Sequence, residues 1–190
     1  MDEGRRLTTG RLARTDGMLM GNEVRFSAPW SPTLRIVTIL VCALLATVSV
    51  MGSVVSENVP LGLRLLAFIA PVGILVGTQF FVVRGYVLTE NELRIERLGW
   101  ANHIDLRNVF SATADPEAMR GSIRLWGSGG LFGFFGWYRN KKLGVYRAYC
   151  TDPKRSVIVK LTNRTIVVTP DNPDRFVEEI KTRRSFAGNP

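Results

Sequence analysis

Two long, uncharged apolar runs dominate the hydrophobic pattern, Ile36–Val55 and Leu65–Val83. Twenty helical residues rise about 30 Å, which is the thickness of the hydrocarbon core of a bilayer. The pattern therefore predicts two transmembrane helices, over about 34–55 and 63–83. Because Ser56–Arg64 is short, we expect a tight hairpin whose two flanking segments lie on the same side of the membrane.

After Arg84 the period of the pattern changes to two, which is typical of strands. Tyr86–Thr89 and Leu93–Glu96 flank Glu90-Asn91-Glu92 and predict a β-hairpin. Glu23–Ala28 predicts a short extended piece. Further strands are predicted at Trp100–Leu106, Val109–Thr113, Ser122–Trp126, Val145–Thr151, Val157–Thr162 and Thr165–Thr169.

The end of the chain predicts one amphipathic helix, Pro173–Ile180, with Asn172 as its cap. Many short strands followed by a helix predict an α+β, mainly β domain, built as a small barrel or sandwich that the helix closes. The predicted units are a flexible basic tail (1–28), a transmembrane hairpin (29–84), a soluble domain (85–184) and a C-terminal tail (185–190). Translation starts at Met1, Met18 or Met20.

Charge orients this arrangement, because the net charge of +9 is unevenly placed. Arginines are frequent before the first apolar run, and Arg84 follows the second. The positive-inside rule then predicts a multi-pass protein of the cell (inner) membrane with both termini in the cytoplasm. The basic soluble part favours an anionic lipid surface or an acidic partner, although topology alone also explains it. Nucleic acid is an unlikely partner, since the charges are scattered and lack a recognition motif.

The inventory of reactive side chains predicts a protein that is not an enzyme. His103 is the single histidine and has no neighbouring Cys or carboxylate cluster, so no metal or other cofactor is expected. Cys42 lies in an apolar run and Cys150 in the soluble part, which excludes a disulfide between them in this topology. The nearest pair of acids, Glu178 and Glu179, are adjacent on a helix and point in different directions.

Small residues recur at a spacing of four in both apolar runs. Gly73 and Gly77 share one face of the second run, and Ser49 and Ser53 share one face of the first. Small residues allow helices to approach closely. The favoured interpretation is packing of the two helices within the hairpin, and the alternative is a face for dimerisation.

Several segments of the soluble part carry a resemblance to a known family. They are the Gly/Phe-rich segment 127–140, Leu143-Gly144-Val145-Tyr146, Tyr149-Cys150-Thr151, the strand Val157–Leu161 and the closing segment 168–176. With the layout above, the chain over about Gly85–Arg184 resembles the membrane-anchored bacterial PH (pleckstrin-homology-like) domain proteins. The resemblance implies a bent β-barrel of about seven strands capped by a C-terminal helix, a fold that mostly serves binding and assembly.

The first hairpin departs from the pattern of eukaryotic lipid-binding PH domains, which read inositol phosphates with clustered Lys and Arg. Here that turn is Glu90-Asn91-Glu92, which would repel phosphate. The more attractive surface is the aromatic and basic patch of Trp137, Tyr138, Arg139, Lys141 and Lys142. This patch would contact lipid headgroups or an acidic protein groove, or it is an ordinary solvated end of a hairpin.

Two functions follow from these observations. The favoured one is a non-enzymatic interaction or assembly module, fixed at the cytoplasmic face by its hairpin and joined to a protein partner or to a second copy of itself. The alternative is a reader of anionic lipid or of membrane surface charge through the loop 126–142.

Overall fold

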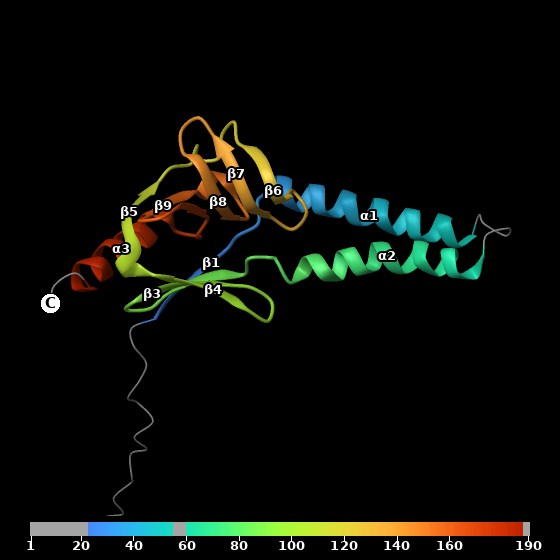
Figure 1. Ribbon diagram of the computed structural model, residues 1–190, viewed down its shortest axis with the longest axis horizontal. Coiled ribbons are helices and arrows are strands. Elements are labelled where there is room, and N and C mark those ends of the chain that lie inside the picture. Colours follow the sequence, from blue (N-terminus) through green and yellow to red (C-terminus); the bar gives the residue numbers. More distant parts are fainter. Residues whose placement is uncertain (1–22, 55–59, 188–190) are drawn as a thin grey trace, which may run out of the picture.

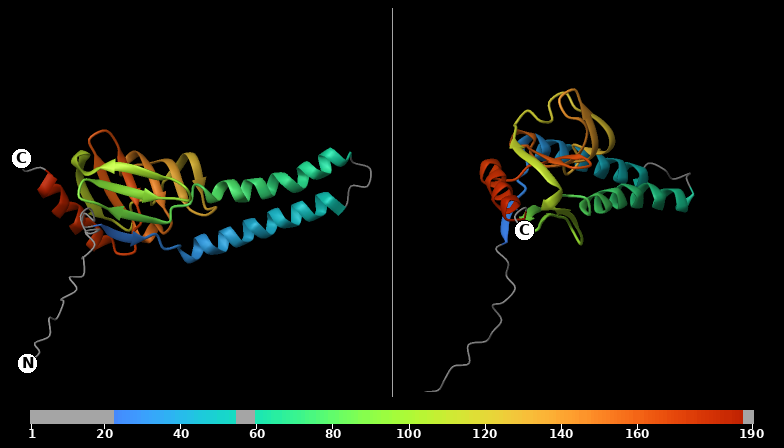
Figure 2. Two further views of the ribbon diagram at one scale, coloured as in Figure 1. Left: turned by 90° about the horizontal axis from the view of Figure 1, so that it is seen from below. Right: turned by 60° about the vertical axis from the view of Figure 1, so that its left-hand side comes forward.

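The computed structural model describes residues 23–54 and 60–187, so Met18, Met20 and most of the predicted tail lie outside the described residues. Two long helices leave a β-rich domain side by side from one end, and a third helix lies at the opposite end (Figure 1). The views in Figure 2 show the same arrangement from two further sides. We call these the helix-side end and the far end of the domain.

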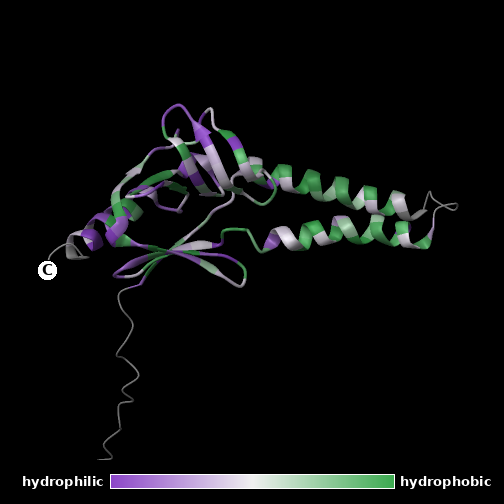
Figure 3. Cartoon of the chain, viewed as in Figure 1, coloured by the Kyte–Doolittle hydropathy of each residue, from purple (hydrophilic) through white to green (hydrophobic). Residues whose placement is uncertain are grey.

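The two long helices are α1 (Pro32–Val54) and α2 (Leu61–Gln79). Ser31 caps α1, since its Oγ accepts a hydrogen bond from the Leu34 amide at 3.1 Å. Both helices are long and apolar enough to cross a membrane (Figure 3). Most of their apolar side chains are exposed. Water does not favour so large an exposed apolar surface.

The helix α2 ends at Gln79, although the apolar run continues to Val83. Val82 and Val83 are buried, and Val83 belongs to the core of the β domain. Periodicity cannot separate the end of an apolar helix from buried residues that follow it directly.

The first sheet is antiparallel and has the order β1-β2-β3-β4. In β3, Leu93 and Ile95 are fully buried while their neighbours are half-buried, which is the alternation that the sequence predicts. The bounds of the strands are β1 (Val24–Ser27), β2 (Gly85–Leu88), β3 (Glu92–Glu96) and β4 (Ala101–Asp105).

The second sheet has the order β5-β9-β10-β8-β7-β6, and only the β10–β8 pair is parallel. Short 3₁₀ turns, η1 (Leu106–Asn108) and η2 (Pro153–Arg155), precede β5 and β9. The strands are β5 (Val109–Ala114), β6 (Ile123–Gly129), β7 (Phe134–Asn140), β8 (Gly144–Cys150), β9 (Val157–Leu161) and β10 (Thr165–Val168).

The main core lies between the two sheets and the helix α3 (Pro173–Ala187). Phe176 of α3 is fully buried and packs edge-on against Phe26 and Tyr86. The Tyr86 hydroxyl joins the sheets, because it donates to the Tyr149 carbonyl at 2.6 Å and accepts from the Thr169 amide at 3.0 Å. Burial raises the pKa of Tyr86 above its usual value.

The mixed helix and strand composition and the C-terminal helix agree with the prediction. Asn172 caps α3 through a 3.1 Å hydrogen bond from the Arg175 amide to its Oδ1. The seven-stranded closed barrel is not confirmed, because the described strands number four in one sheet and six in the other and do not close. The strand β1 falls within the predicted extended piece Glu23–Ala28, whereas β7, which lies in the Gly/Phe-rich segment, is not among the predicted strands.

Candidate functional site

A cavity of about 440 Å³ opens between the two sheets at the helix-side end. Its walls are mostly aromatic, and its charges come from two arginines. The aromatic and charged side chains that line it are Phe81, Trp100, Trp126, Phe135, Trp137, Arg97 and Arg147. A cavity of this volume lies within the usual range for sites that bind small molecules.

The first sheet supplies Arg97, which directly follows β3. Its amide donates to the Trp100 carbonyl at 2.9 Å, which closes the turn into β4. The guanidinium lies 4.3 Å from the centre of the Trp100 ring and 5.3 Å from that of Tyr149. Only 8% of the Arg97 surface is exposed. Aromatic faces stabilise a cation electrostatically but leave its hydrogen-bond donors unused.

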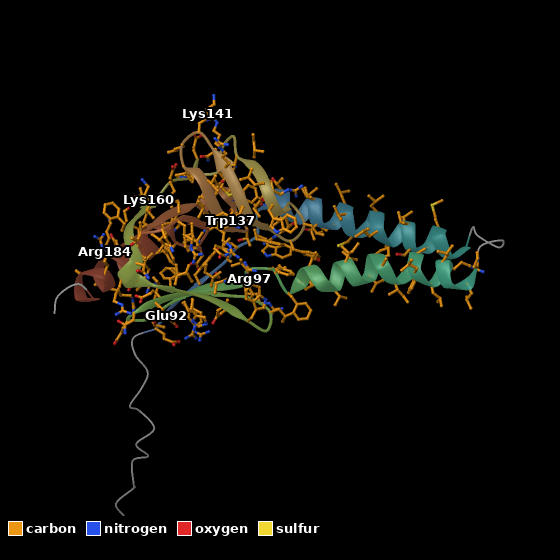
Figure 4. The ribbon with its side chains drawn as sticks, in the orientation of Figure 1. Glu92, Arg97, Trp137, Lys141, Lys160 and Arg184 are labelled. Carbon is orange, nitrogen blue, oxygen red and sulfur yellow. The ribbon has the colours of Figure 1, made fainter. Side chains whose placement is uncertain are left out.

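The second sheet supplies Arg147, which lies on β8 opposite Trp137 of β7. Its guanidinium is 5.8 Å from the Trp137 ring centre and 5.3 Å from the Tyr149 ring centre. Arg97 and Arg147 therefore approach Tyr149 from the two different sheets. Figure 4 shows Arg97 and Trp137 between the sheets, close to the base of the long helices.

Within the described part of the chain, no carboxylate forms an ion pair with either of these arginines. Among the described residues, neither guanidinium forms an ion pair or a side-chain hydrogen bond, and the Nε atom of Arg97 is buried without a partner. Burial is the main cause that lowers the pKa of Arg97, and the nearby charge of Arg147 adds to it. Arginine stays charged at neutral pH, so the cavity is positive and attracts anions.

Two paired glycines give the β6–β7 hairpin its shape beside this cavity. Gly127 and Gly136 face each other across the hairpin, with φ angles of 110° and 123°. A Cβ on either would lie 2.1 Å from a carbonyl oxygen of the opposite strand. Any other residue would push the strands apart, so the Gly/Phe-rich composition is required by the backbone here.

The tip of the same hairpin packs onto α1. The Phe132 amide donates to Thr38 Oγ1 at 3.3 Å, and the Phe132 ring packs edge-on against Trp30 with centroids 6.0 Å apart. A further hydrogen bond joins the Ser31 amide to the Thr151 carbonyl at 3.3 Å. On the α2 side, Trp100 Nε1 donates to the Phe80 carbonyl at 2.8 Å. These contacts fix how the domain sits on both helices.

All four tryptophans of the chain therefore gather at the helix-side end. Trp30 precedes α1, Trp100 bonds to the residue after α2, and Trp126 and Trp137 line the cavity. Trp126 is 76% exposed, and Leu125 beside it on β6 and Phe80 and Phe81 after α2 are exposed as well. Aromatic rings that have an apolar face and a polar edge favour the membrane–water interface.

Comparison with known families agrees with this geometry. A family model described as "Bacterial PH domain" matches residues 84–184, which is more than half of the chain. The chain belongs to the bacterial PH domain family. This confirms the resemblance that the Gly/Phe-rich segment predicts. No curated protein and no solved structure matches the chain.

Within the PH domain, the predicted aromatic and basic patch is divided among three places. Trp137 lines the cavity, whereas Tyr138 points to the other face of the sheet, where its hydroxyl donates to the Ser128 carbonyl at 2.6 Å. Arg139, Lys141 and Lys142 lie at the outer end of the β7–β8 hairpin, and Figure 4 shows Lys141 there, away from the cavity. Lys142 pairs with Asp115.

The sequence pattern does not reveal the two cavity arginines, because no motif or short spacing relates them. Arg97 lies in a turn after β3 and Arg147 lies on β8, and only the packing of the two sheets brings them together. One signal is present in the sequence. Arg147 stands between the two apolar residues Tyr146 and Ala148, in a strand whose C-terminal half is buried.

The small residues of the long helices also divide into two groups. Ser49 is buried, and a Cβ on Gly52 would lie 3.1 Å from Cβ of Ala67, so α1 and α2 meet closely at this face. Gly73 and Gly77 are exposed, and a Cβ on either would meet nothing within 4 Å. Ser53 lies in the last turn of α1, where the side chains fall outside the described set.

The remaining reactive side chains do not assemble into a second site. His103 Nδ1 lies 3.0 Å from Glu92 Oε2 at the far end, and the described residues contain no group of three metal-ligating side chains. Burial raises the pKa of the Cys150 thiol to about 12, and its Sγ donates to the Val167 carbonyl. Cys42 lies in α1.

Proposed function

We propose that this protein is a non-enzymatic membrane protein whose PH domain reads the surface of the bilayer that anchors it. In this proposal α1 and α2 cross the cell (inner) membrane, and the helix-side end of the domain lies in the headgroup layer. The observation that carries the proposal is the gathering of the four tryptophans and of the unbalanced Arg97 and Arg147 at that end.

The position of the aromatic rings supports this placement. A helix that ends at the boundary of the hydrocarbon leaves its flanking residues among the headgroups, where tryptophan is enriched. Trp30 directly precedes α1, and Phe80 and Phe81 directly follow α2. The hydrogen bonds from Phe132 to Thr38 and from Trp100 to Phe80 hold the cavity at the same level.

The distribution of charge supports the orientation and the class of function. Arg35 in the first turn of α1 and Arg84 after α2 both lie on the domain side, which favours the cytoplasm for both termini. PH domains are generally non-catalytic, and the described residues offer a charged cavity without a nucleophile and base in contact. Binding at a charged surface is the function that these groups support best.

Quenching of tryptophan fluorescence tests the placement. The full-length protein is reconstituted into nanodiscs whose lipids carry bromine atoms at the top of the acyl chains, with nanodiscs of unbrominated lipid as the control. We expect strong quenching by bromine and weak quenching by aqueous iodide. Efficient quenching by iodide together with no effect of bromine would contradict the proposal.

Assembly of two or more copies is the second candidate function, and one observation favours it. Gly73 and Gly77 point away from α1 and leave a flat, open face on α2. The variant Gly73→Leu/Gly77→Leu should then lower the mass of the complex measured in nanodiscs or mild detergent. Gly62→Leu is the matched control, since Gly62 is equally open but lies at the start of α2. An unchanged mass in both variants removes this candidate.

A further inference from the structure

We propose that the cavity between Arg97 and Arg147 binds the phosphate group of one anionic membrane phospholipid. This inference rests on the proposed function, because it requires the helix-side end of the domain to lie at the headgroup layer. It differs from general attraction to a charged surface, since it assigns one lipid to one cavity. It also places the ligand away from the first hairpin of the domain.

The charges of the cavity require an anion. Arg97 is more than nine-tenths buried, yet its Nε donor has no partner and its charge has no counterion among the described residues. Removing a guanidinium from water is unfavourable unless hydrogen bonds replace the lost solvation. A phosphate offers several acceptor oxygens to the fork of donors that a guanidinium presents. One phosphate between the two sheets therefore satisfies both arginines.

The walls of the cavity suit the apolar part of a lipid. Phe81 stacks on Phe135 with ring centroids 5.9 Å apart, and it meets Trp100 edge-on at 6.2 Å. Phe81 also directly follows α2, so the aromatic wall continues into the apolar surface of the long helices. A phospholipid whose phosphate lies between the arginines can extend its acyl chains along this surface. Binding of a soluble phosphate would not require an aromatic wall of this kind.

The distribution of carboxylates favours the same end of the domain. The acidic turn with Glu90 and Glu92 lies at the far end, where Figure 4 shows Glu92 on the side away from the long helices. At that end, the Glu92 carboxylate accepts a hydrogen bond from the Arg94 guanidinium and forms another with the His103 ring. None of the described residues that line the cavity between the sheets is acidic. An anion would thus meet positive charge at the helix-side end and negative charge at the far end.

The test is lipid retention by the full-length protein. Nanodiscs of phosphatidylcholine with a minor fraction of phosphatidic acid are dissolved gently, and native mass spectrometry counts the phosphatidic acid that stays bound. We expect one retained molecule on the unmodified protein. Loss of charge-assisted hydrogen bonds in Arg97→Gln/Arg147→Gln should lower this retention by about tenfold or more. Arg97→Lys/Arg147→Lys should retain more lipid than the Gln variant.

The matched control is Arg139→Gln/Lys141→Gln, which removes the same charge from the exposed end of the β7–β8 hairpin. It should retain phosphatidic acid as the unmodified protein does. Thermal unfolding of each variant is measured in parallel. If the double Gln variant does not fold, Arg147→Gln alone carries the test, because Arg147 is only half-buried.

Three results would overturn the inference. One is equal retention by the unmodified protein and the Arg97→Gln/Arg147→Gln variant, and another is no retention by the unmodified protein. The third is equally tight binding of inorganic phosphate in nanodiscs of pure phosphatidylcholine, which would assign the cavity to a soluble anion. If bromine still quenches the tryptophan fluorescence in any of these cases, the proposed placement at the headgroup layer is kept and only the phosphate site is rejected. Failure of the phosphate site can thus be distinguished from failure of the proposed function.

Discussion

The two ends of the PH domain differ in whether their arginines are paired with carboxylates. At the far end, Arg94 pairs with Glu92 at 3.1 Å and Arg107 pairs with Asp105 at 2.7 Å. At the helix-side end, the guanidinium groups of Arg97 and Arg147 lie over aromatic rings and form no ion pair with a described residue. Arg94 and Arg97 are three residues apart, so the difference does not come from the composition of the segment. It comes from the position of each side chain relative to the sheets and the long helices.

This contrast separates arginines that are paired within the fold from arginines for which we propose a ligand. An arginine whose charge is paired with a carboxylate on a solvated surface contributes little to stability. A buried arginine without a counterion costs free energy that the rest of the fold must offset. Unsatisfied groups of this kind concentrate at functional sites. This is why we assign the proposed function to the helix-side end of the domain.

The largest expected effect concerns the shape of the helix-side end. The substitution Gly136→Ala places a Cβ against the Trp126 carbonyl, at a backbone φ of 123°. We expect it to lower the free energy of unfolding by about 3 kcal/mol and to distort the cavity. Gly144→Ala is the matched control, because Gly144 has φ 67° but open space around it, and it should cost about 1 kcal/mol.

The measurement is denaturant unfolding of the full-length protein in detergent, followed by tryptophan fluorescence. If Gly136→Ala costs no more than Gly144→Ala, then the close approach of β6 and β7 does not shape the cavity. The contrast between the two ends would then lose its structural basis.

A smaller effect is expected where the domain meets α1. Thr38→Val removes the hydroxyl that accepts the hydrogen bond from the Phe132 amide and leaves that amide unpaired in a buried position. We expect a loss of about 1 to 2 kcal/mol of local stability, and hence roughly tenfold faster amide exchange in the β6–β7 tip.

Hydrogen exchange followed by mass spectrometry measures this change in nanodiscs. Thr47→Val serves as the control, since the Thr47 hydroxyl bonds to the Ala43 carbonyl within α1 and does not contact the domain. Equal exchange in both variants would show that the tip is held by other contacts. Exchange in β2 and β3 should stay unchanged in either case.

The smallest effect is expected at the far end and depends on pH. The hydrogen bond with His103, followed by that from Arg94, lowers the pKa of the Glu92 carboxyl below its usual value. A lowered pKa adds stability above the pKa of the unfolded chain, and this stability is lost as the pH falls through the lower folded value. Glu92→Gln should therefore reduce stability by less than about 1 kcal/mol at neutral pH, because the pair is partly exposed.

The free energies of unfolding of the Gln variant and of the unmodified protein should converge as the pH falls below the range in which carboxylates titrate. A constant difference down to the lowest pH would contradict the assigned role of Glu92. Lipid retention should be the same in both proteins, because Glu92 lies at the opposite end from the cavity.

The local parts of this fold could be predicted from the sequence. The β2–β3 hairpin follows from alternation around Glu90-Asn91-Glu92, and the caps Ser31 and Asn172 follow from short-range signals. The strand β7 could not be predicted in the same way. Its glycine, Gly136, weakens a strand pattern, and it fits a strand only because it lies opposite Gly127 of β6.

The site depends on contacts far apart in the sequence. The predicted patch groups Trp137 with Tyr138 and Lys141 because they are neighbours along the chain, yet successive residues of a strand point to opposite faces. Of this patch, Trp137 lines the cavity. The arginines come from two sheets, and no periodicity within either strand reveals that these sheets face each other.

The most direct test of the central claim compares the depth of the two ends in a bilayer. Spin labels are attached to Trp126→Cys and, separately, to Glu90→Cys in the full-length protein, with Cys42 replaced by alanine. Cys150 can remain, because burial raises the pKa of its thiol to about 12 and keeps it unreactive. Electron paramagnetic resonance then measures collisions with oxygen and with a water-soluble nickel complex. We predict that the label at position 126 lies at the depth of the headgroups and that the label at position 90 is fully in water. Equal aqueous exposure of both labels would contradict the proposed placement of the helix-side end.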